Sequence, residues 1–341
     1  MRYLVTGGCG FIGSHLVDAL LARGDEVAVL DDLSSGKLEN LSERASLLRG
    51  SVLDRELVRY GVRGVQACIH LAAIASVTRS DKDWIGSHNV NQTGFVVLLD
   101  ALRQAGLRVP VVYASSAAVY GHQRQMPIPE TAPLRPISAY GADKLCCEIQ
   151  ARTAAQTCGI PSLGLRFFNV YGPRQDPTSP YSGVISIFAK AVLEKKPLTV
   201  FGDGRQTRDF VFVRDVVAAL LAAVDKTAPR ADVLNVCAGT ATTISQLAST
   251  IMSVGGANVP IAYRAARAGD IRHSVGSPLC AIPRLGIGKA TLLYEGLRQT
   301  LEWLRETREA QGSRPGGATN SSTGGVLTGG VKTEAAREGG V

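Results

Sequence analysis

The chain has 341 residues, of which 45% are hydrophobic and 19% are charged, a composition typical of a water-soluble α/β protein with an ample core. Its 37 basic and 29 acidic side chains give a formal net charge of +8, but the basic residues are scattered and form no stripe with interleaved aromatics, so we expect no nucleic-acid partner. The longest apolar run, Val216 to Val224, is too short to span a bilayer, and we expect no membrane partner either.

The chain begins with a predicted strand, a glycine-rich turn and a predicted helix. Tyr3 to Val5 is a short apolar run, and glycines follow at positions 7, 10 and 13 before an apolar helix begins. Glycine permits the tight turn, the close approach of backbone amides to a diphosphate, and the packing of helix against strand. The positive end of the helix dipole then faces the phosphates. Because turns also accumulate glycine, the interpretation depends on the segment after this helix.

A second apolar run, Glu26 to Leu30, ends in the adjacent acids Asp31 and Asp32, at the distance downstream where a carboxylate holds the adenosine ribose. We assign Asp31 to the ribose hydroxyls and expect Asp32 to begin the following loop. A carboxylate here would repel the additional phosphate of NADP, so the pattern predicts an NAD site. A tight turn followed by a solvated aspartate is the alternative. Because the first strand begins at the first residues, we expect no secretion signal.

Predicted strands and helices keep alternating after Asp31. The β-rich runs are 67–71, 111–114 and 162–168, and the helical stretches include 93–105 and 139–158. Such alternation predicts a parallel sheet covered on both faces. The expected fold class is therefore α/β, with a doubly wound parallel Rossmann sheet over residues 1–168.

The pattern changes near Asn169, where Pro173, Pro177 and Pro180 crowd one loop. A smaller α+β substrate domain is expected to begin there. The run 232–236 looks like a strand that returns to the main sheet, so we predict that the two domains are interleaved. The Rossmann domain would comprise 1–168 with a return segment near 209–237, and the smaller domain would comprise 169–208 and 238–311.

The carboxyl-terminal segment 312–341 is rich in glycine, serine and threonine, and it lacks aromatic residues and periodicity. Such a segment cannot bury enough apolar area to offset its ordering entropy. We expect a disordered tail, and a peptide recognised by a partner is the alternative.

Seven cysteines, an odd number, occur at positions 9, 68, 146, 147, 158, 237 and 280, most of them within apolar strands or helices. Their spacing fits no metal site. We interpret them as reduced core thiols, which favours a cytoplasmic location and no bound metal.

Tyr140 and Lys144 are four residues apart near the start of the helix predicted at 139–158, so both side chains project from one face. An ammonium beside a phenol lowers the phenol pKa from about 10 towards neutral pH, which makes tyrosine a usable general base. The two residues also occur at this spacing by chance, and an exposed helix pair is the alternative.

Ser115 and Ser116 follow the strand predicted at 111–114, at the carboxyl end where ligands bind in open parallel sheets. A hydroxyl at this place can hydrogen-bond a substrate oxygen and orient it towards the tyrosine. The alternative role is a helix or turn cap, for which serine is equally suitable.

Four arginines, Arg205, Arg208, Arg267 and Arg272, lie in two segments of the predicted smaller domain. Guanidinium groups suit diphosphates, because their donors match phosphate oxygens in pairs. Surface ion pairs are the alternative, above all for Arg205 and Arg272.

Taken together, the segments resemble a known family, the extended short-chain dehydrogenase/reductases that act on nucleotide sugars, and in particular its UDP-glucose and UDP-N-acetylglucosamine 4-epimerases. The resemblance runs from Met1 to about Trp303, and its motifs are TGGCGFIG, LDDLSSG, HLAA, NVNQTG, SSAAVYG, YGADK, RFFNVYGPRQDP, FGDGRQTRDF and RAGDIRHS. It implies NAD held tightly in the Rossmann domain and a UDP-sugar gripped by the smaller domain. It also implies a homodimer, formed where the helices beginning near Thr93 and Tyr140 pack against their mates.

The resemblance assigns the chemistry to three residues: Tyr140 as the base, Lys144 as its tuning partner and nicotinamide-ribose ligand, and Ser116 as the hydroxyl that assists at the sugar. The implied cofactor site comprises Gly7, Gly10, Phe11, Ile12, Gly13, Asp31, Asp32, Ser51, Val52, Leu71, Ala72, Ala73, Asn91, Ser115, Tyr140, Lys144 and Phe167. Ser51 departs from the family, whose members usually carry an adenine-binding aspartate at this position, although a serine hydroxyl could serve.

The implied substrate site joins Ser116 to seven residues of the smaller domain: Asn169, Val184, Phe201, Arg208, Arg267, Asp270 and Ser274. The diphosphate would meet the asparagine and both arginines, the uridine ribose would meet the aspartate, and the uracil would lie near the valine and phenylalanine. Ser274 would border the hexose pocket. A bulky aromatic at this position in related epimerases closes the space for an N-acetyl group, whereas serine leaves that space open. A surface serine is the alternative.

The two residues after Ser116 bear on the reaction. Related dehydratases carry an Asp-Glu pair there, and related decarboxylating enzymes keep the glutamate, but this chain has Ala117 and Ala118. Without a group to protonate a leaving hydroxyl, the expected reaction is 4-epimerisation through a transient 4-keto sugar. The alternatives are another enzyme of the family, such as a 4,6-dehydratase, and a non-catalytic NAD-binding sensor, a class that commonly lacks the Tyr/Lys pair.

Overall fold

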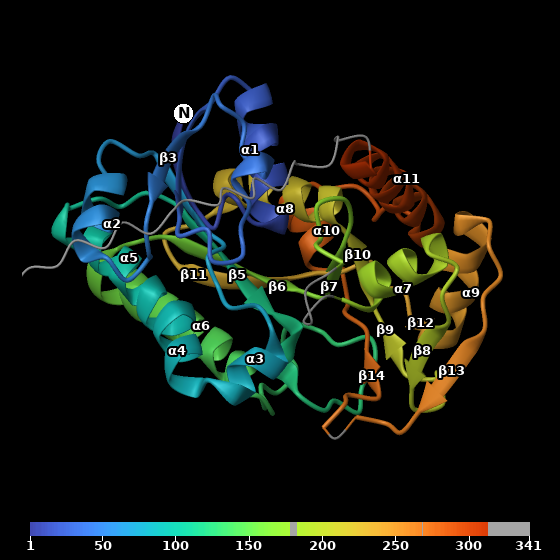
Figure 1. Ribbon diagram of the computed structural model, residues 1–341. Helices are drawn as coiled ribbons and strands as arrows, with labels where there is room; N and C mark the ends of the chain where they lie inside the picture. Colours follow the sequence, from blue (N-terminus) through green and yellow to red (C-terminus); the bar gives the residue numbers. More distant parts are fainter. Residues whose placement is uncertain (178–182, 268, 313–341) are drawn as a thin grey trace, which may run out of the picture.

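The computed structural model describes residues 1–177, 183–267 and 269–312. Its centre is a seven-stranded parallel sheet with the strand order β11-β6-β5-β4-β1-β2-β3 (Figure 1). The strands are β1 (Arg2–Thr6), β2 (Glu26–Asp31), β3 (Ser46–Arg49), β4 (Ala67–His70), β5 (Val111–Ser116), β6 (Ser162–Phe167) and β11 (Ala231–Val236). The chain order reverses beside β1, whose neighbours are β2 and β4, and ligands bind at such a switch point in open parallel sheets.

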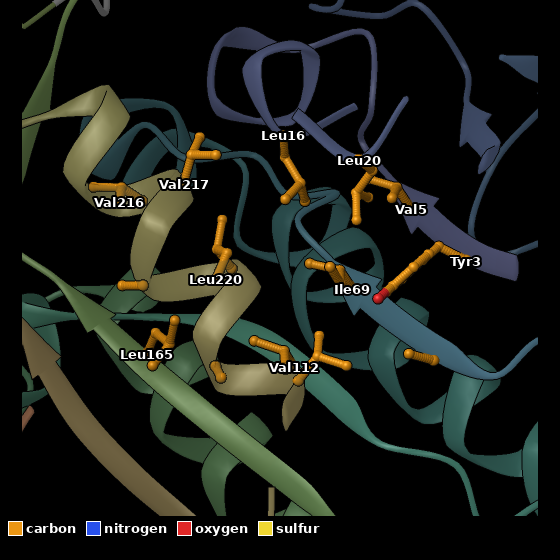
Figure 2. Close-up of a cluster of buried hydrophobic side chains, with 14 of the residues drawn as sticks. Tyr3, Val5, Leu16, Leu20, Ile69, Val112, Leu165, Val216, Val217 and Leu220 are labelled. Carbon is orange, nitrogen blue, oxygen red and sulfur yellow. The ribbon is translucent and has the colours of Figure 1, made fainter. Parts of the chain in front are cut away.

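Helices cover both faces of this sheet. One face packs against α1 (Phe11–Ala22), α8 (Val213–Lys226) and α10 (Ala281–Leu285), and the other packs against α2 (Arg55–Gly61), α5 (Gly94–Gln104) and α6 (Ala139–Cys158). Figure 2 shows the first interface, where Leu16 and Leu20 of α1 and Leu220 of α8 meet the sheet residues Val5 and Val112. The predicted doubly wound α/β class is confirmed.

A second unit surrounds a separate apolar core. Its short strands are β7 (Asn169–Tyr171), β8 (Leu198–Phe201), β9 (Thr207–Arg208), β10 (Phe210–Phe212), β12 (Thr242–Thr243), β13 (Ile261–Arg264) and β14 (His273–Ser274), and its helices are α7 (Val184–Leu193), α9 (Ile244–Gly255) and α11 (Leu293–Gly312). They form the pairs β10-β7 and β13-β8 and the three-stranded sheet β12-β9-β14. We propose that the two domains are interleaved with the predicted bounds, which is supported by the position of β11 at the edge of the main sheet. The short helix α10 packs against α8 and the main sheet despite its place after residue 238.

Several remaining elements lie near the carboxyl ends of the central strands: η1 (Leu38–Asn40), α3 (Val77–Lys82), α4 (Trp84–His88), the π turn η2 (Asn89–Thr93) and the 3₁₀ turn η3 (Ala117–Tyr120). The predicted helix 139–158 begins and ends where expected, whereas the helix predicted from residue 93 starts at Gly94 after the π turn. Among the described residues, no helix is both long and apolar enough to cross a membrane. The predicted disordered tail lies outside the described residues, apart from Gly312 at the end of α11.

Candidate functional site

The glycine-rich turn follows β1 and lies against the chain that leaves β4. Gly7 has a φ of 73°, and a Cβ atom on it would lie 2.7 Å from the backbone nitrogen of Ala72. A Cβ atom on Gly13 would lie 2.1 Å from the carbonyl oxygen of Gly7. Helix α1 then begins at Phe11, and its N-cap residue Gly10 has no side chain to cap it, so its first N–H groups are available to an anion. The three glycines therefore fit the roles predicted for them.

Asp31, the last residue of β2, contacts this turn through its carboxylate. Its Oδ2 accepts from the backbone nitrogen of Cys9 at 2.9 Å, and its Oδ1 accepts from that of Leu33 at 2.9 Å. Burial raises the pKa of the Asp31 carboxyl, and these two amide donors oppose the rise. Each oxygen keeps a lone pair for a further donor, such as a ribose hydroxyl. Asp32 is exposed and accepts from the backbone nitrogen of Ser34, as expected of a residue that begins a loop.

The loop after β4 is held by a buried polar pair that sequence reasoning missed. The Thr6 hydroxyl oxygen accepts from the backbone nitrogen of Ala72 at 3.3 Å and lies 2.8 Å from Nδ1 of His70. Burial, together with the charge of Lys144, lowers the pKa of His70 to about 3, so its ring is neutral at physiological pH. The Thr6–His70 pair places Leu71 and Ala72 against the glycine turn.

Asn91 holds the next residues of the same loop. Its Oδ1 accepts from the backbone nitrogen of Ile74 at 2.7 Å, and its Nδ2 donates to the carbonyl of Ile74 at 3.3 Å. The side chain is fully buried inside the π turn η2, a rare element that is often found at functional sites. Because both polar atoms are engaged by the loop that follows Ala73, Asn91 acts on the cofactor site through this loop, and its predicted direct contact stays a prediction.

The other predicted cofactor residues lie around these two loops. Ser51 follows β3, and its hydroxyl oxygen accepts from the backbone nitrogen of Leu53 at 3.2 Å, which leaves its proton free for a ligand. The apolar members pack into the protein: Val52 and Phe167 are buried, and Phe11 and Ile12 are partly buried at the start of α1. Their predicted contacts with a cofactor stay predictions.

Helix α6 carries Tyr140 and Lys144 on one face. Ser138 caps the helix through the backbone nitrogen of Gly141 at 3.1 Å. The Lys144 side chain is 1% exposed, and its ammonium lies 5.8 Å from the centre of the Tyr140 ring. Within the described ranges no side chain or carbonyl accepts a hydrogen bond from this ammonium. A buried, unpaired cation is costly, so this nitrogen is suited to a ligand oxygen.

Ser116 stands at the end of β5, where both of its predicted roles are compatible. Its oxygen accepts from the backbone nitrogen of Ala118 at 3.1 Å and so caps η3, while its proton remains available. A Cβ atom on Gly141 would lie 2.6 Å from the carbonyl oxygen of Ala118. The residue after Tyr140 therefore contacts the turn that begins at Ser116, which brings β5 and α6 together.

Ser115 points the opposite way, into a buried network that was not predicted. Its hydroxyl donates to Oε1 of Glu148 at 2.6 Å. Glu148 lies one turn beyond Lys144 on α6 and receives two hydrogen bonds from Arg166, at 2.8 and 2.7 Å. Arg166 also donates to the hydroxyl of Tyr120 at 2.8 Å. The network joins the ends of β5 and β6 to the middle of α6.

The second unit brings together the predicted substrate residues of β9 and β14. Arg208 is aligned with Ser274 in the parallel pair of these strands, and its Nη2 donates to Oδ1 of Asp270 at 2.5 Å. Burial lowers the pKa of Arg208, and the charge of Asp270 opposes this effect. The guanidinium of Arg267 lies 4.1 Å from the centre of the Phe201 ring.

Other predicted residues of this unit have different surroundings. The side-chain amide of Asn169 donates to the carbonyl of Asp209 at 3.1 Å, and Val184 begins α7. Arg272 makes a two-bond pair with Asp203, at 2.8 and 2.7 Å, with both side chains about half exposed. This is the surface ion pair that we gave as the alternative for Arg272. Arg205 is exposed. Among the described residues no cluster of three or more metal-ligating side chains occurs.

Comparison with known proteins gives a consistent result. The model of the NAD dependent epimerase/dehydratase family matches residues 3–237. The UDP-glucose 4-epimerase of Mycolicibacterium smegmatis is 38% identical over 311 residues, which cover 89% of this chain and 99% of that protein.

Two solved structures have the same fold. The UDP-glucose 4-epimerase of Thermotoga maritima, solved with UDP-glucose, is 37% identical with a TM-score of 0.87. The match covers 90% of this chain and 100% of that chain. The UDP-N-acetylglucosamine 4-epimerase of Methanobrevibacter ruminantium, solved with UDP-N-acetylmuramic acid, is 33% identical with a TM-score of 0.85. The match covers 90% of this chain and 98% of that chain.

Proposed function

Because the chain belongs to the NAD dependent epimerase/dehydratase family, we propose that it is a 4-epimerase of UDP-hexoses, which interconverts UDP-glucose and UDP-galactose. The observation that carries the choice of reaction is the pair of alanines that follows Ser116. Ala117 and Ala118 form the start of η3, and the carbonyl of Ala118 touches Gly141, beside the proposed base. No carboxyl group stands at this point to expel water from the sugar.

The residues present fit NAD, the cofactor of this family. The glycine turn leaves no room for a Cβ at Gly7 or Gly13, which keeps backbone amides open to a diphosphate. Asp31 retains lone pairs for the adenosine ribose, and the unpaired ammonium of Lys144 suits the nicotinamide ribose. When bound, NAD supplies a hydride acceptor and donor for C4 of the sugar.

Tyr140, Lys144 and Ser116 then have separate roles. Tyr140 takes the proton of the sugar 4-hydroxyl as the general base, and the ammonium of Lys144 lies 5.8 Å from the centre of its ring. Ser116 donates its free proton to the same sugar oxygen while its own oxygen stays fixed on η3. After the ketone has turned its other face, the hydride would return to C4 from NAD and Tyr140 would return the proton to the oxygen, so that the configuration at C4 is inverted.

The nucleotide is proposed to bind on the second unit. Arg208 and Arg267 would hold the diphosphate together with Asn169, and Asp270 would accept from the uridine ribose. The contact of Arg208 with Asp270 supports this proposal, because the proposed diphosphate ligand and the proposed ribose ligand are then neighbours. Phe201 and Val184 would flank the uracil, and Arg267 already stacks on the Phe201 ring.

We further propose that the N-acetylated pair of UDP-hexoses is accepted. Ser274 is aligned with Arg208 and is partly buried, so its small side chain borders the proposed diphosphate site. A structural relative at 33% identity is a UDP-N-acetylglucosamine 4-epimerase, which supports space for the larger sugar in this fold.

A cytoplasmic homodimer is proposed as the working form. α4, η2 and α5 follow one another without a break in helical backbone angles, and they lie beside α6. Trp84 and Ile85 on the first of these helices are 67% and 78% exposed, and Ile149 on α6 is 50% exposed. Large apolar side chains at such exposure support burial against a second copy. Size-exclusion chromatography with light scattering tests this, and a monomer at micromolar concentration would contradict it.

Incubation of the purified protein with UDP-glucose, UDP-galactose and their N-acetylated counterparts tests the proposed reaction. Anion-exchange chromatography should show the C4 epimer of each substrate, with no net consumption of added NAD. A product lacking one water would identify a dehydratase instead. Bound NAD without turnover of any of the four sugars would identify a sensor.

A further inference from the structure

Asp209 occupies the single position between two short strands that belong to different sheets. β9, before it, pairs with β12 and β14, whereas β10, after it, pairs with β7. Its side chain is fully buried. A carboxylate at such a junction needs hydrogen-bond donors, because burial of an uncompensated charge is costly.

The donors are backbone N–H groups of two separate loops. Oδ1 accepts from Ala238 at 2.7 Å, and Oδ2 accepts from Gly239 at 2.9 Å and from Gly276 at 3.2 Å. Ala238 and Gly239 follow β11 of the main sheet, and Gly276 follows β14 of the second unit. Burial raises the pKa of Asp209 to about 6 and the three amides oppose the rise, so the group is ionised at neutral pH.

The backbone around Asp209 reaches the proposed substrate ligands. Its carbonyl accepts from the backbone nitrogen of Asn169 at 2.9 Å and from the side-chain amide of Asn169 at 3.1 Å. Arg208 directly precedes it and is aligned with Ser274, which is two residues before Gly276. Asp209 therefore contacts Asn169 through its backbone carbonyl, while its carboxylate ties the segment that carries Arg208 to the loops after β11 and β14, the second of which follows Ser274.

We propose that Asp209 is a positioning residue of the nucleotide-sugar site, which fixes the loops after β11 and β14 against β9 and so sets the spacing of the substrate ligands. The inference rests on the proposed function, because the residues that it positions are the proposed ligands of the UDP-sugar. Asp209 would contact no reacting atom. Its removal should therefore weaken substrate binding and leave the chemical step largely unchanged.

Asp209→Asn tests this, because the side-chain NH₂ group cannot accept from the amides. We expect at least a tenfold rise in the KM for UDP-glucose and in the Kd for UDP alone, measured by calorimetry. The kcat should change less than threefold, and the amount of copurified NAD should not change. A tenfold fall of kcat with an unchanged KM would overturn the proposal.

Asp215→Asn is the matched control. Asp215 also accepts a backbone N–H and a hydroxyl from one distant residue, Thr291, at 2.8 Å each, but it joins α8 to the chain before α11 and contacts no proposed ligand. We expect its Kd for UDP to stay within twofold of wild type. If both variants have the same Kd for UDP and both are less stable to heat, Asp209 has only a structural role and the proposal is wrong.

A failure of the proposed function is distinguishable, because it is seen in the wild-type protein itself, as an absence of 4-epimerase activity or of UDP binding. If Asp209→Asn does not fold, hydrogen–deuterium exchange of the wild-type protein with and without UDP decides. UDP should slow exchange at 237–239 and 275–277 together with 206–209. Slowing confined to 206–209 would overturn the proposal.

Discussion

The ammonium of Lys144 lies 5.8 Å from the centre of the Tyr140 ring, one turn further along α6, in a position that is almost closed to solvent. A cation that is both buried and unpaired within the described residues is costly unless a ligand oxygen approaches it. The position of this pair therefore supports the proposed base and the proposed contact of Lys144 with the cofactor.

Removal of the base should separate chemistry from binding. Tyr140→Phe keeps the ring but deletes the proton acceptor, so turnover of UDP-glucose should fall by roughly 10²–10⁴-fold. The Kd for UDP should stay close to wild type. Tyr60→Phe is the control, since Tyr60 is 54% exposed on α2 and should tolerate the change. Near-normal activity of Tyr140→Phe would remove this residue from the mechanism.

Lys144→Ala should reduce both turnover and cofactor retention. The wild-type protein should copurify with NAD, because the glycine turn and Asp31 are proposed to bind one end of the dinucleotide and Lys144 the other. Acid release followed by enzymatic assay gives the NAD content per chain. We expect a clear deficit in Lys144→Ala but none in Lys195→Ala, whose side chain is exposed. Full NAD content in the first variant would contradict the assigned ribose contact.

Sugar selection should depend on Ser274. Ser274→Tyr places a bulky ring where the N-acetyl group is proposed to lie, so turnover of UDP-N-acetylglucosamine should be abolished and that of UDP-glucose should be spared. Ser274→Ala controls for loss of the hydroxyl and should keep both activities. Equal loss on both substrates in Ser274→Tyr, or a wild type that ignores N-acetylated sugars, would leave a plain UDP-glucose 4-epimerase.

The neutral state of His70 predicts a pH dependence of folding stability. Its pKa is lowered to about 3 in the folded protein, first by burial and then by Lys144, whereas the unfolded chain has an ordinary histidine pKa. Between these values the unfolded state binds more protons, so stability is fully present above the unfolded pKa and is lost as the pH falls. The slope contributed by one proton is about 1.4 kcal/mol per pH unit.

Urea unfolding of the wild type and of His70→Asn between pH 6 and 4.5 measures this contribution. Other titrating groups are shared and cancel in the difference. As the pH falls, the free energy of unfolding should decrease more steeply for the wild type than for the variant. The difference between the two slopes should be at most the slope contributed by one proton. Parallel pH dependences would show that His70 is protonated in the folded state.

The local features of this protein were readable from its sequence. The strand, glycine turn and helix that begin the chain, Asp31 at the end of β2, and the bounds of α6 depend on steric demands and periodicities within a few neighbouring residues. The placement of Tyr140 and Lys144 on one helix face follows from their spacing alone. Motif resemblance added the family and the reaction class, which the comparisons support.

Tertiary structure alone decided the features that depend on distant partners. The two-residue strands β9, β12 and β14 have no periodicity to recognise, and they exist because β12 and β14 each pair with β9 across the fold. The neutral state of His70 depends on its burial and on the charge of Lys144 from α6, and the Glu148–Arg166 pair joins a helix to a strand. Asp209 gathers amides about 30 and 67 residues away in the chain. A sequence pattern shows such residues as ordinary polar side chains, because only burial makes their partners obligatory.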